Sequence, residues 1–168
     1  PNREEMGIAN HKDSAKGAYI IKGYDNKRAK KGVVIIRGTA PINSLMQILP
    51  SLKNKGPNIK IIAAVSMELF KAQNQKYQES IISHPEWNDC MIITNTSLKS
   101  MGNWMRNRFV AKYSLSPDFD NRWRTGGSVD QIITESGLDP LSILNGITRF
   151  SNERDKRLEL IKKEIPNY

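Results

Sequence analysis

The stretch "IIAAVSMELFKAQNQKYQESII", residues 61–82, joins a short apolar run to a polar segment almost without a loop. The apolar part has the length and composition of a buried strand, which we predict over residues 58–66. The polar part has helical spacing and predicts one or two short helices over residues 67–82. The end of a strand is where α/β proteins usually collect reactive groups. A polar run without a reactive side chain at this position therefore indicates a role other than catalysis.

Four side chains of this polar segment are candidates for core or interface positions. Phe70, Gln73 and Tyr77 fall at i, i+3 and i+7, so they share one face if the segment is helical. Phe70 is expected in the core, because burial is the default for an aromatic ring. Gln73 and Tyr77 are amphipathic and suit an interface that is partly buried and partly exposed to solvent. The alternative is that they only form hydrogen bonds with local backbone groups. Glu68 supplies a favourable charge to the first helical turn or takes part in a contact at the strand end.

Strands and helices alternate along the rest of the chain. This order predicts an α/β fold with three layers (α/β/α) and a mostly parallel sheet of about five strands, one of them an antiparallel edge strand. One strand of the five is a short one within the turn-rich segment 114–127. The other strands are predicted over residues 18–24, 32–38, 58–66 and 89–95, and helices over residues 41–54, 67–82 and 98–113.

Two further helices have readable start signals. Ser128 and Gln131 form the pattern of a capping box, and Gly137 is expected to close the helix that follows. Asp139 then caps, and Pro140 begins, a single long terminal helix.

At 168 residues the chain is long enough for one domain with a full core. We predict an N-terminal extension or linker over residues 1–13 and one domain over residues 14–168. The polar N-terminal segment lacks the apolar core of a signal peptide, so we do not interpret it as one. The chain begins with Pro rather than Met, which is consistent with a fragment of a longer protein. Its only cysteine, Cys90, lies in an apolar run and is expected to be a small buried hydrophobe rather than a nucleophile. A lone cysteine excludes a disulfide framework and indicates a cytoplasmic location.

The charge balance is basic, with 26 Lys and Arg against 17 Asp and Glu, a net charge of +9. A positive net charge of this size favours binding to nucleic acid, to an anionic membrane or to an acidic partner. The charges are dispersed, however, and the dense run "NKRAKKG" (26–32) is interpreted as a solvated turn between strands. Because no basic motif is interleaved with aromatic residues, and no apolar run approaches the about 18 residues of a membrane span, we predict neither nucleic-acid nor membrane partners.

The chain carries no constellation that predicts catalysis. His11, His84 in the loop "SHPEW", and Cys90 lie far apart, without the spacing of a transition-metal site. Nucleophile-elbow, Walker and dinucleotide-binding glycine motifs are absent. We therefore predict no catalytic, cofactor-binding or metal-binding residues in this chain, which reads as an α/β module without an active site of its own.

Two glycine-containing turns beside an arginine are candidate anion sites. "RGTA" contains Gly38 and Thr39, and "RTGG" contains Arg124 and Gly126. Either turn could hold an anion at the start of a helix, and the alternative is that both are only turns.

Three stretches, taken in order, resemble the C-terminal domain of transketolase and its thiamine-diphosphate relatives. "KGAYIIKGY" (16–24) is similar to the opening edge strand of that family. "VVIIRGTAPINSLMQILPSLKNKG" (33–56) is similar to its strand, Gly-Thr turn and apolar helix. The most specific stretch is residues 59–82, in which a Val-Ser-Met strand end is followed by a Phe, a Gln and a Tyr.

The resemblance implies a domain of an enzyme that moves two-carbon ketol units between sugar phosphates. In such enzymes thiamine diphosphate and its magnesium or calcium ion lie between two preceding domains. The C-terminal domain serves packing, dimer contact or regulation, and the full-length enzyme is a homodimer. The resemblance thus implies that the polar run after Ser66 is an interface, and that the isolated chain is inactive.

The sequence departs from the family pattern in two places, and these leave alternatives open. The turn of residues 38–41 is Gly-Thr-Ala-Pro, where the family usually has Thr-Gly-Ser and an acidic residue. Residues 113–131 differ from the family's phenylalanine-glycine stretch. The alternatives are a domain of an E1 component of a 2-oxo acid dehydrogenase, and a stand-alone basic module that binds an anionic ligand or an acidic partner.

Overall fold

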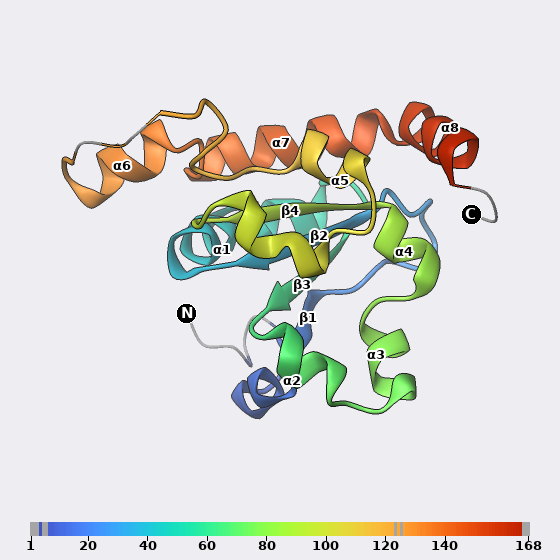
Figure 1. Cartoon of the computed structure of the whole chain (residues 1–168). Coiled ribbons are helices and arrows are strands. Elements are labelled where there is room, and N and C mark those ends of the chain that lie inside the picture. Colours follow the sequence, from blue (N-terminus) through green and yellow to red (C-terminus); the bar gives the residue numbers. More distant parts are fainter. Residues whose placement is uncertain (1–3, 5–6, 123, 125, 166–168) are drawn as a thin grey trace.

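The computed structural model describes residues 4, 7–122, 124 and 126–165. Its centre is one mixed sheet in which β2 pairs in parallel with both β3 and β4, and β1 pairs antiparallel with β3 (Figure 1). The predicted α/β fold with one antiparallel edge strand is confirmed. In spatial order the strands are β1 (Ala18–Lys22), β3 (Lys60–Ala64), β2 (Val33–Arg37) and β4 (Cys90–Thr94).

Among the described residues the sheet has four strands rather than about five. The segment after α5 (Arg108–Tyr113) contributes a single parallel bridge, between Ile93 and Leu115. Leu115 donates to the Ile92 carbonyl and accepts from the Thr94 amide, at 2.8 and 3.0 Å. Pro117 follows two residues later and has no N–H to extend the ladder, which explains why pairing ends at once.

Alternate residues of the strands feed two hydrophobic clusters, one on each face of the sheet. On one face Val34 and Ile36 pack with side chains of α1 (Thr39–Asn54) and α7 (Pro140–Asn152), among them Leu45 and Phe150. On the other face the neighbouring strand residues pack with Met67, Phe70, Trp104 and Val110, from the helical segments that cover that side. A strand buried on both faces has no polar side to alternate with, which accounts for the continuous apolar runs in the sequence.

The helical segments complete the three layers (Figure 1). Two of them are 3₁₀ helices and the others are α-helices. They are η1 (His11–Lys16), α1 (Thr39–Asn54), α2 (Met67–Lys71), α3 (Gln75–Ile81), α4 (His84–Asn88), η2 (Leu98–Trp104), α5 (Arg108–Tyr113), α6 (Val129–Glu135), α7 (Pro140–Asn152) and α8 (Arg154–Glu164).

The predicted start signals of the last helices are confirmed. Ser128 and Gln131 form the capping box of α6, and Gly137 follows that helix in a left-handed conformation. The Asp139 carboxylate accepts from the Leu141 and Ser142 amides at 3.0 and 3.1 Å.

Three helix predictions were wrong in detail. The helix predicted over residues 98–113 is two elements, η2 and α5, because the Asn107 side chain accepts from the Phe109 and Val110 amides and starts a new helix. The single long terminal helix breaks at Glu153 into α7 and α8. His84 lies in the short helix α4 rather than in a loop.

The N-terminal segment is joined to the sheet edge through Gly17. Its carbonyl accepts from the Val65 and Ser66 amides at 2.9 and 3.0 Å. A Cβ on Gly17 would lie 2.3 Å from the Phe70 nitrogen, and its φ is +86°, so both space and conformation require glycine. The helix η1 crosses the predicted boundary after residue 13, and parts of both predicted units lie outside the described residues. The division at residue 13 stays a prediction.

Candidate functional site

The carboxyl ends of β3, β2 and β4 lie side by side at one edge of the sheet. The chain passes from β2 to β3 on one side and reaches β4 on the other, so the direction of winding changes between β2 and β4. Ligands of open α/β sheets bind at such a switch point. Gly38 follows the end of β2 there, and Thr39 is the first residue of α1, as predicted.

Gly38 is held closely against Asn95, the residue that follows β4. Gly38 has a φ of +103°, and a Cβ there would lie 1.9 Å from Asn95 Oδ1. The Asn95 amide therefore occupies the space over Gly38 at the switch point. Thr39 is exposed and begins the first turn of α1. Anion binding at Gly38 and Thr39 stays a prediction.

A hydroxyl–carboxylate cluster lies beyond the end of β4, and sequence reasoning missed it. Asp118 accepts from the Ser116 hydroxyl at 2.6 Å and from the Ser97 hydroxyl at 2.7 Å. The Ser116 hydrogen bond is the main cause that lowers the pKa of Asp118, partly opposed by burial. Ser97 and Asp118 are 21 positions apart, and no local pattern links them.

Arg124 and Gly126 do not join Gly38 and Thr39 through any hydrogen bond or ion pair among the described residues. The Arg124 guanidinium binds Asp120 at 3.0 Å and the Pro117 carbonyl at 3.2 Å, and it lies over the Phe119 ring. These two contacts lie within its own loop, while Arg124 Nε is buried and has no hydrogen-bond partner among the described residues. Gly126 is exposed, with φ +119° and open space where a Cβ would lie. An anion at this second turn also stays a prediction.

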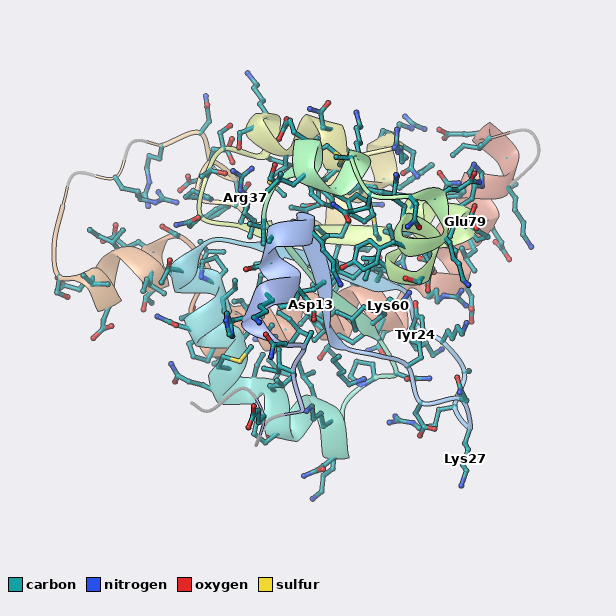
Figure 2. The ribbon with its side chains drawn as sticks, turned by 90° about the horizontal axis from the view of Figure 1, so that it is seen from below. Asp13, Tyr24, Lys27, Arg37, Lys60 and Glu79 are labelled. Carbon is teal, nitrogen blue, oxygen red and sulfur yellow. The ribbon has the colours of Figure 1, made fainter. Side chains whose placement is uncertain are left out.

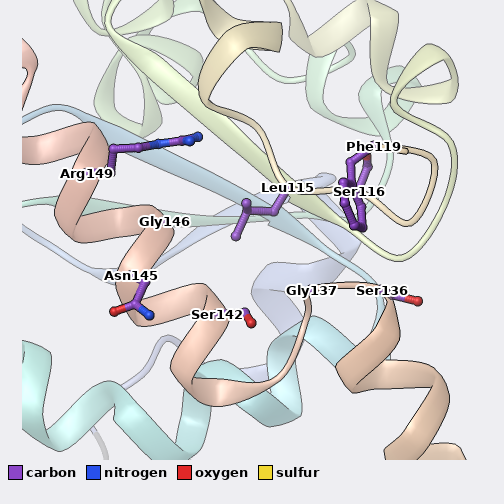
Figure 3. Close-up of a pocket in the computed structure, with 9 residues that line it drawn as sticks. All are labelled: Leu115, Ser116, Phe119, Ser136, Gly137, Ser142, Asn145, Gly146 and Arg149. Carbon is purple, nitrogen blue, oxygen red and sulfur yellow. The ribbon is translucent and has the colours of Figure 1, made fainter. Parts of the chain in front are cut away.

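A cavity of about 330 Å³ is lined by the segment around Leu115 and by α7 (Figure 3). A Cβ on Gly146 of α7 would approach Leu115 Cδ1 to 2.8 Å, so the absence of a side chain at this position sets the spacing of the two walls. Arg149 of α7 lines one end, and Phe119 and Ser116 line the other (Figure 3).

Phe70 lies in the core, as predicted. It is 1% exposed and stacks on Trp104 with ring centroids 5.8 Å apart. Trp87 completes an aromatic triangle, at 6.5 Å from Phe70 and 5.9 Å from Trp104. This cluster fastens α2, α4 and η2 to the same face of the sheet.

Gln73 and Tyr77 do not share a helix face with Phe70, because the segment is two helices with a break at residues 72–74. The Asn74 side chain accepts from the Tyr77 amide at 2.9 Å and starts the second helix. Gln73 Nε2 donates to the Leu69 carbonyl at 2.9 Å, and the Tyr77 hydroxyl donates to the Ala18 carbonyl at 2.9 Å. Both side chains are half-buried and bound to backbone groups within the chain.

Glu68 lies on an exposed part of the same segment. It accepts from the Ser66 hydroxyl at 2.9 Å; hydrogen bonds from its own backbone amide, and then from that hydroxyl, lower the pKa of Glu68. Val65 and Leu69 on either side are large apolar residues that are 42% and 46% exposed. We therefore treat Glu68, Val65 and Leu69 together as a candidate contact surface.

The described part of the chain contains no group of three or more His, Cys, Asp or Glu residues placed to hold a metal ion. Cys90 is buried, as predicted, and burial raises the pKa of its thiol to about 12. Among the described residues no helix has the length and apolar character needed to cross a membrane.

Two curated transketolases are similar to the chain in sequence. Transketolase 2 of Escherichia coli is 25% identical over 71 residues, 42% of this chain and 10% of that protein. The chloroplastic transketolase of Solanum tuberosum is 22% identical over 139 residues, 82% of this chain and 18% of that protein. The chain thus spans less than a fifth of these relatives. No protein-family model matches it.

Solved transketolases share the fold. The Campylobacter jejuni structure superposes with a TM-score of 0.59 at 14% identity, covering 83% of this chain and 19% of that one. The Leishmania mexicana structure gives 0.57 at 12% identity, with 89% and 19% covered. A Pichia stipitis transketolase in complex with sedoheptulose 7-phosphate gives 0.56 at 14% identity, with 92% and 20% covered. The resemblance to the C-terminal domain of transketolase is confirmed.

Proposed function

We propose that this chain acts as the non-catalytic C-terminal domain of a transketolase-like enzyme that transfers two-carbon ketol units between sugar phosphates. The observation that carries the proposal is that sequence and fold point to the same relatives over most of the chain, 82% of it in the potato enzyme and 83% in the Campylobacter structure. The matched relatives favour this parent over the E1 component of a 2-oxo acid dehydrogenase.

We propose that no residue of this chain holds the metal ion or the cofactor of this reaction. The described residues offer no cluster of metal ligands, and we assign no residue of this chain to thiamine diphosphate or to its magnesium or calcium ion. Both belong, in this proposal, to preceding domains of the parent. We expect that calorimetric titration of the isolated chain with thiamine diphosphate and magnesium gives no heat of binding. Micromolar binding would contradict this assignment.

The surface around Glu68 is the proposed contact with a preceding domain or the second subunit of a homodimer. Leu69 is the better probe of this surface than Tyr77, because the Tyr77 hydroxyl is already bound to Ala18 within the chain. In the parent enzyme, Leu69→Glu should weaken subunit association and ketol transfer together, measured by sedimentation and by a coupled assay.

The matched control is Leu141→Glu, which places the same charge at an apolar residue that is 64% exposed on α7. We expect the control to leave association unchanged. If both substitutions have the same effect on association, the surface around Glu68 is not the interface.

A cytoplasmic location stays a prediction, since one curated relative is a chloroplast enzyme.

A further inference from the structure

A second cavity, of about 440 Å³, lies at the opposite edge of the sheet, near the amino ends of β2 and β3. Its walls come from the basic loop before β2, the end of α1 and the polar face of α7. Figure 2 shows Lys27 of that loop far from Arg37, which ends β2 beside the predicted anion turn. The residues that line the cavity and enter the argument are Arg28, Lys31, Lys55, Asn58, Thr148 and Ser151.

Three cations converge on this cavity. Arg28, Lys31 and Lys55 all line it, no carboxylate does, and none of the three forms an ion pair among the described residues. The charge of Arg28, one of the three, also acts on a neighbouring lysine outside the cavity lining. The pKa of Lys22 is lowered, first by burial and then by the charges of Arg28 and Lys53. Uncompensated positive charge in a concave site attracts anions.

The basic loop is exposed over residues 26–30, and hydrogen bonds to distant residues hold its backbone in place. The buried Asn58 side chain donates to the Asp25 and Arg28 carbonyls at 2.8 Å each and accepts from the Asp25 amide at 2.8 Å. Arg28 Nη2 donates to the Gly56 carbonyl at 2.7 Å, which fixes its guanidinium at the rim. These bonds join residues 28 to 33 positions apart, and they position the Arg28 guanidinium before any ligand arrives.

The floor of the cavity contains a hydroxyl that lacks a partner. Ser151 lines the cavity, is 1% exposed, and its Oγ has no hydrogen-bond partner among the described residues. Thr148, one turn earlier on α7, shows the usual arrangement, since its hydroxyl donates to the Leu144 carbonyl at 2.8 Å. Buried polar groups are nearly always paired, and an unpaired one beside a cationic cavity points to a ligand oxygen.

We propose that this cavity binds the phosphate group of a small phosphorylated metabolite. Three cations match a dianionic phosphate monoester, and an arginine at the rim suits its paired oxygens. The cavity volume of about 440 Å³ is in the range of small-ligand sites, about 300 to 1,000 Å³. The lining contains no aromatic ring on which a base could stack, which disfavours nucleic acid.

The test is a titration of the 168-residue chain with inorganic phosphate and with glucose 6-phosphate, followed by NMR amide shifts and calorimetry, with glucose as the uncharged control. We expect saturable binding of both phosphates, with shifts at Lys31, Gly56 and Ser151, and none with glucose. Lys55→Gln should weaken binding about tenfold, the effect of losing a charged hydrogen-bond partner. Lys99→Gln, the same change at an exposed lysine in η2, should not.

Ser151→Ala separates a ligand contact from a packing role. We expect it to weaken phosphate binding several-fold, up to about tenfold, while leaving the unfolding midpoint unchanged or raised, because the hydroxyl has no partner to lose. An unchanged affinity in this variant would overturn the proposal. Equal losses of phosphate affinity in Lys55→Gln and Lys99→Gln would also overturn it, and so would amide shifts confined to Gly38 and Thr39. Binding of an acidic peptide or of single-stranded DNA, without any binding of phosphate, would overturn it as well. None of these outcomes depends on the identity of the parent enzyme.

Discussion

Arg157 and Asp89 form a buried ion pair that ties the last helix to the start of β4. Arg157 Nη2 and Nε reach Asp89 Oδ1 at 2.7 and 3.0 Å, and Arg157 is 1% exposed. Its third nitrogen donates to the Phe150 carbonyl at 2.5 Å, just before the break between α7 and α8. Arg154 binds the other Asp89 oxygen at 2.7 Å. The break in the terminal helix thus lets two arginines converge on one carboxylate.

We predict that Arg157→Met lowers the free energy of unfolding by about 3 to 5 kcal/mol, because it removes a partner from a buried charge. Arg108→Met is the control. It breaks the ion pair of Arg108 with Glu164, whose side chains are 75% and 36% exposed, and should cost less than about 1 kcal/mol. Urea unfolding of the two variants measures the difference, and similar costs would mean that burial does not strengthen the Asp89 pair.

Gly38→Ala should destabilise the chain by about 2 kcal/mol or more, since the new methyl group meets Asn95 Oδ1 at 1.9 Å and the positive φ adds strain. Asn95→Ala alone should be mild because Asn95 is exposed. The double variant should recover only the steric part and keep the cost of the positive φ. Additive costs in this cycle, followed by thermal unfolding, would show that the two residues are not coupled.

Cys90 should be unreactive in the folded chain. Its Sγ donates to the Trp87 carbonyl at 3.3 Å, and burial raises the pKa of the thiol to about 12, so almost no thiolate exists at neutral pH. We expect iodoacetamide to modify the native chain only as fast as it unfolds, and the chain in concentrated urea rapidly. Mass spectrometry follows the reaction. Fast modification under native conditions, independent of stability, would contradict the burial of this thiol.

Asp118 should make stability depend on pH in the acid range. Its folded-state pKa lies below the ordinary value of 3.8, so its contribution is fully present above that value and is lost as the pH falls through the folded-state pKa. Ser116→Ala removes the first cause of the shift and should raise the pKa of Asp118, read by carboxyl NMR titration. Ser100→Ala, which removes an exposed hydroxyl not bound to Asp118, should leave it unchanged. An unaltered Asp118 titration in Ser116→Ala would assign the shift to another cause.

The sequence determined those features that depend on neighbours along the chain. The β-branched runs fix β2 and β4 as strands buried on both faces. The capping pair Ser128 and Gln131 fixes the start of α6, and Asp139 with Pro140 fixes the start of α7. These features were predictable because period, capping and proline geometry act over one or two turns.

Tertiary structure decided which of these elements meet and what their side chains bind. The Arg157–Asp89 pair joins positions 68 apart, and the Asn58 bonds that shape the basic loop join positions about 30 apart. Local periodicity carries no information about such distant partners, so the sequence pattern predicts only a solvated turn for "NKRAKKG". The fold places two cations of this turn, Arg28 and Lys31, in the same cavity lining as the buried Ser151, whose hydroxyl has no partner among the described residues. The physical reason is that the behaviour of a charged side chain depends on its burial and on the groups that face it. Both are supplied by distant segments that only folding brings together.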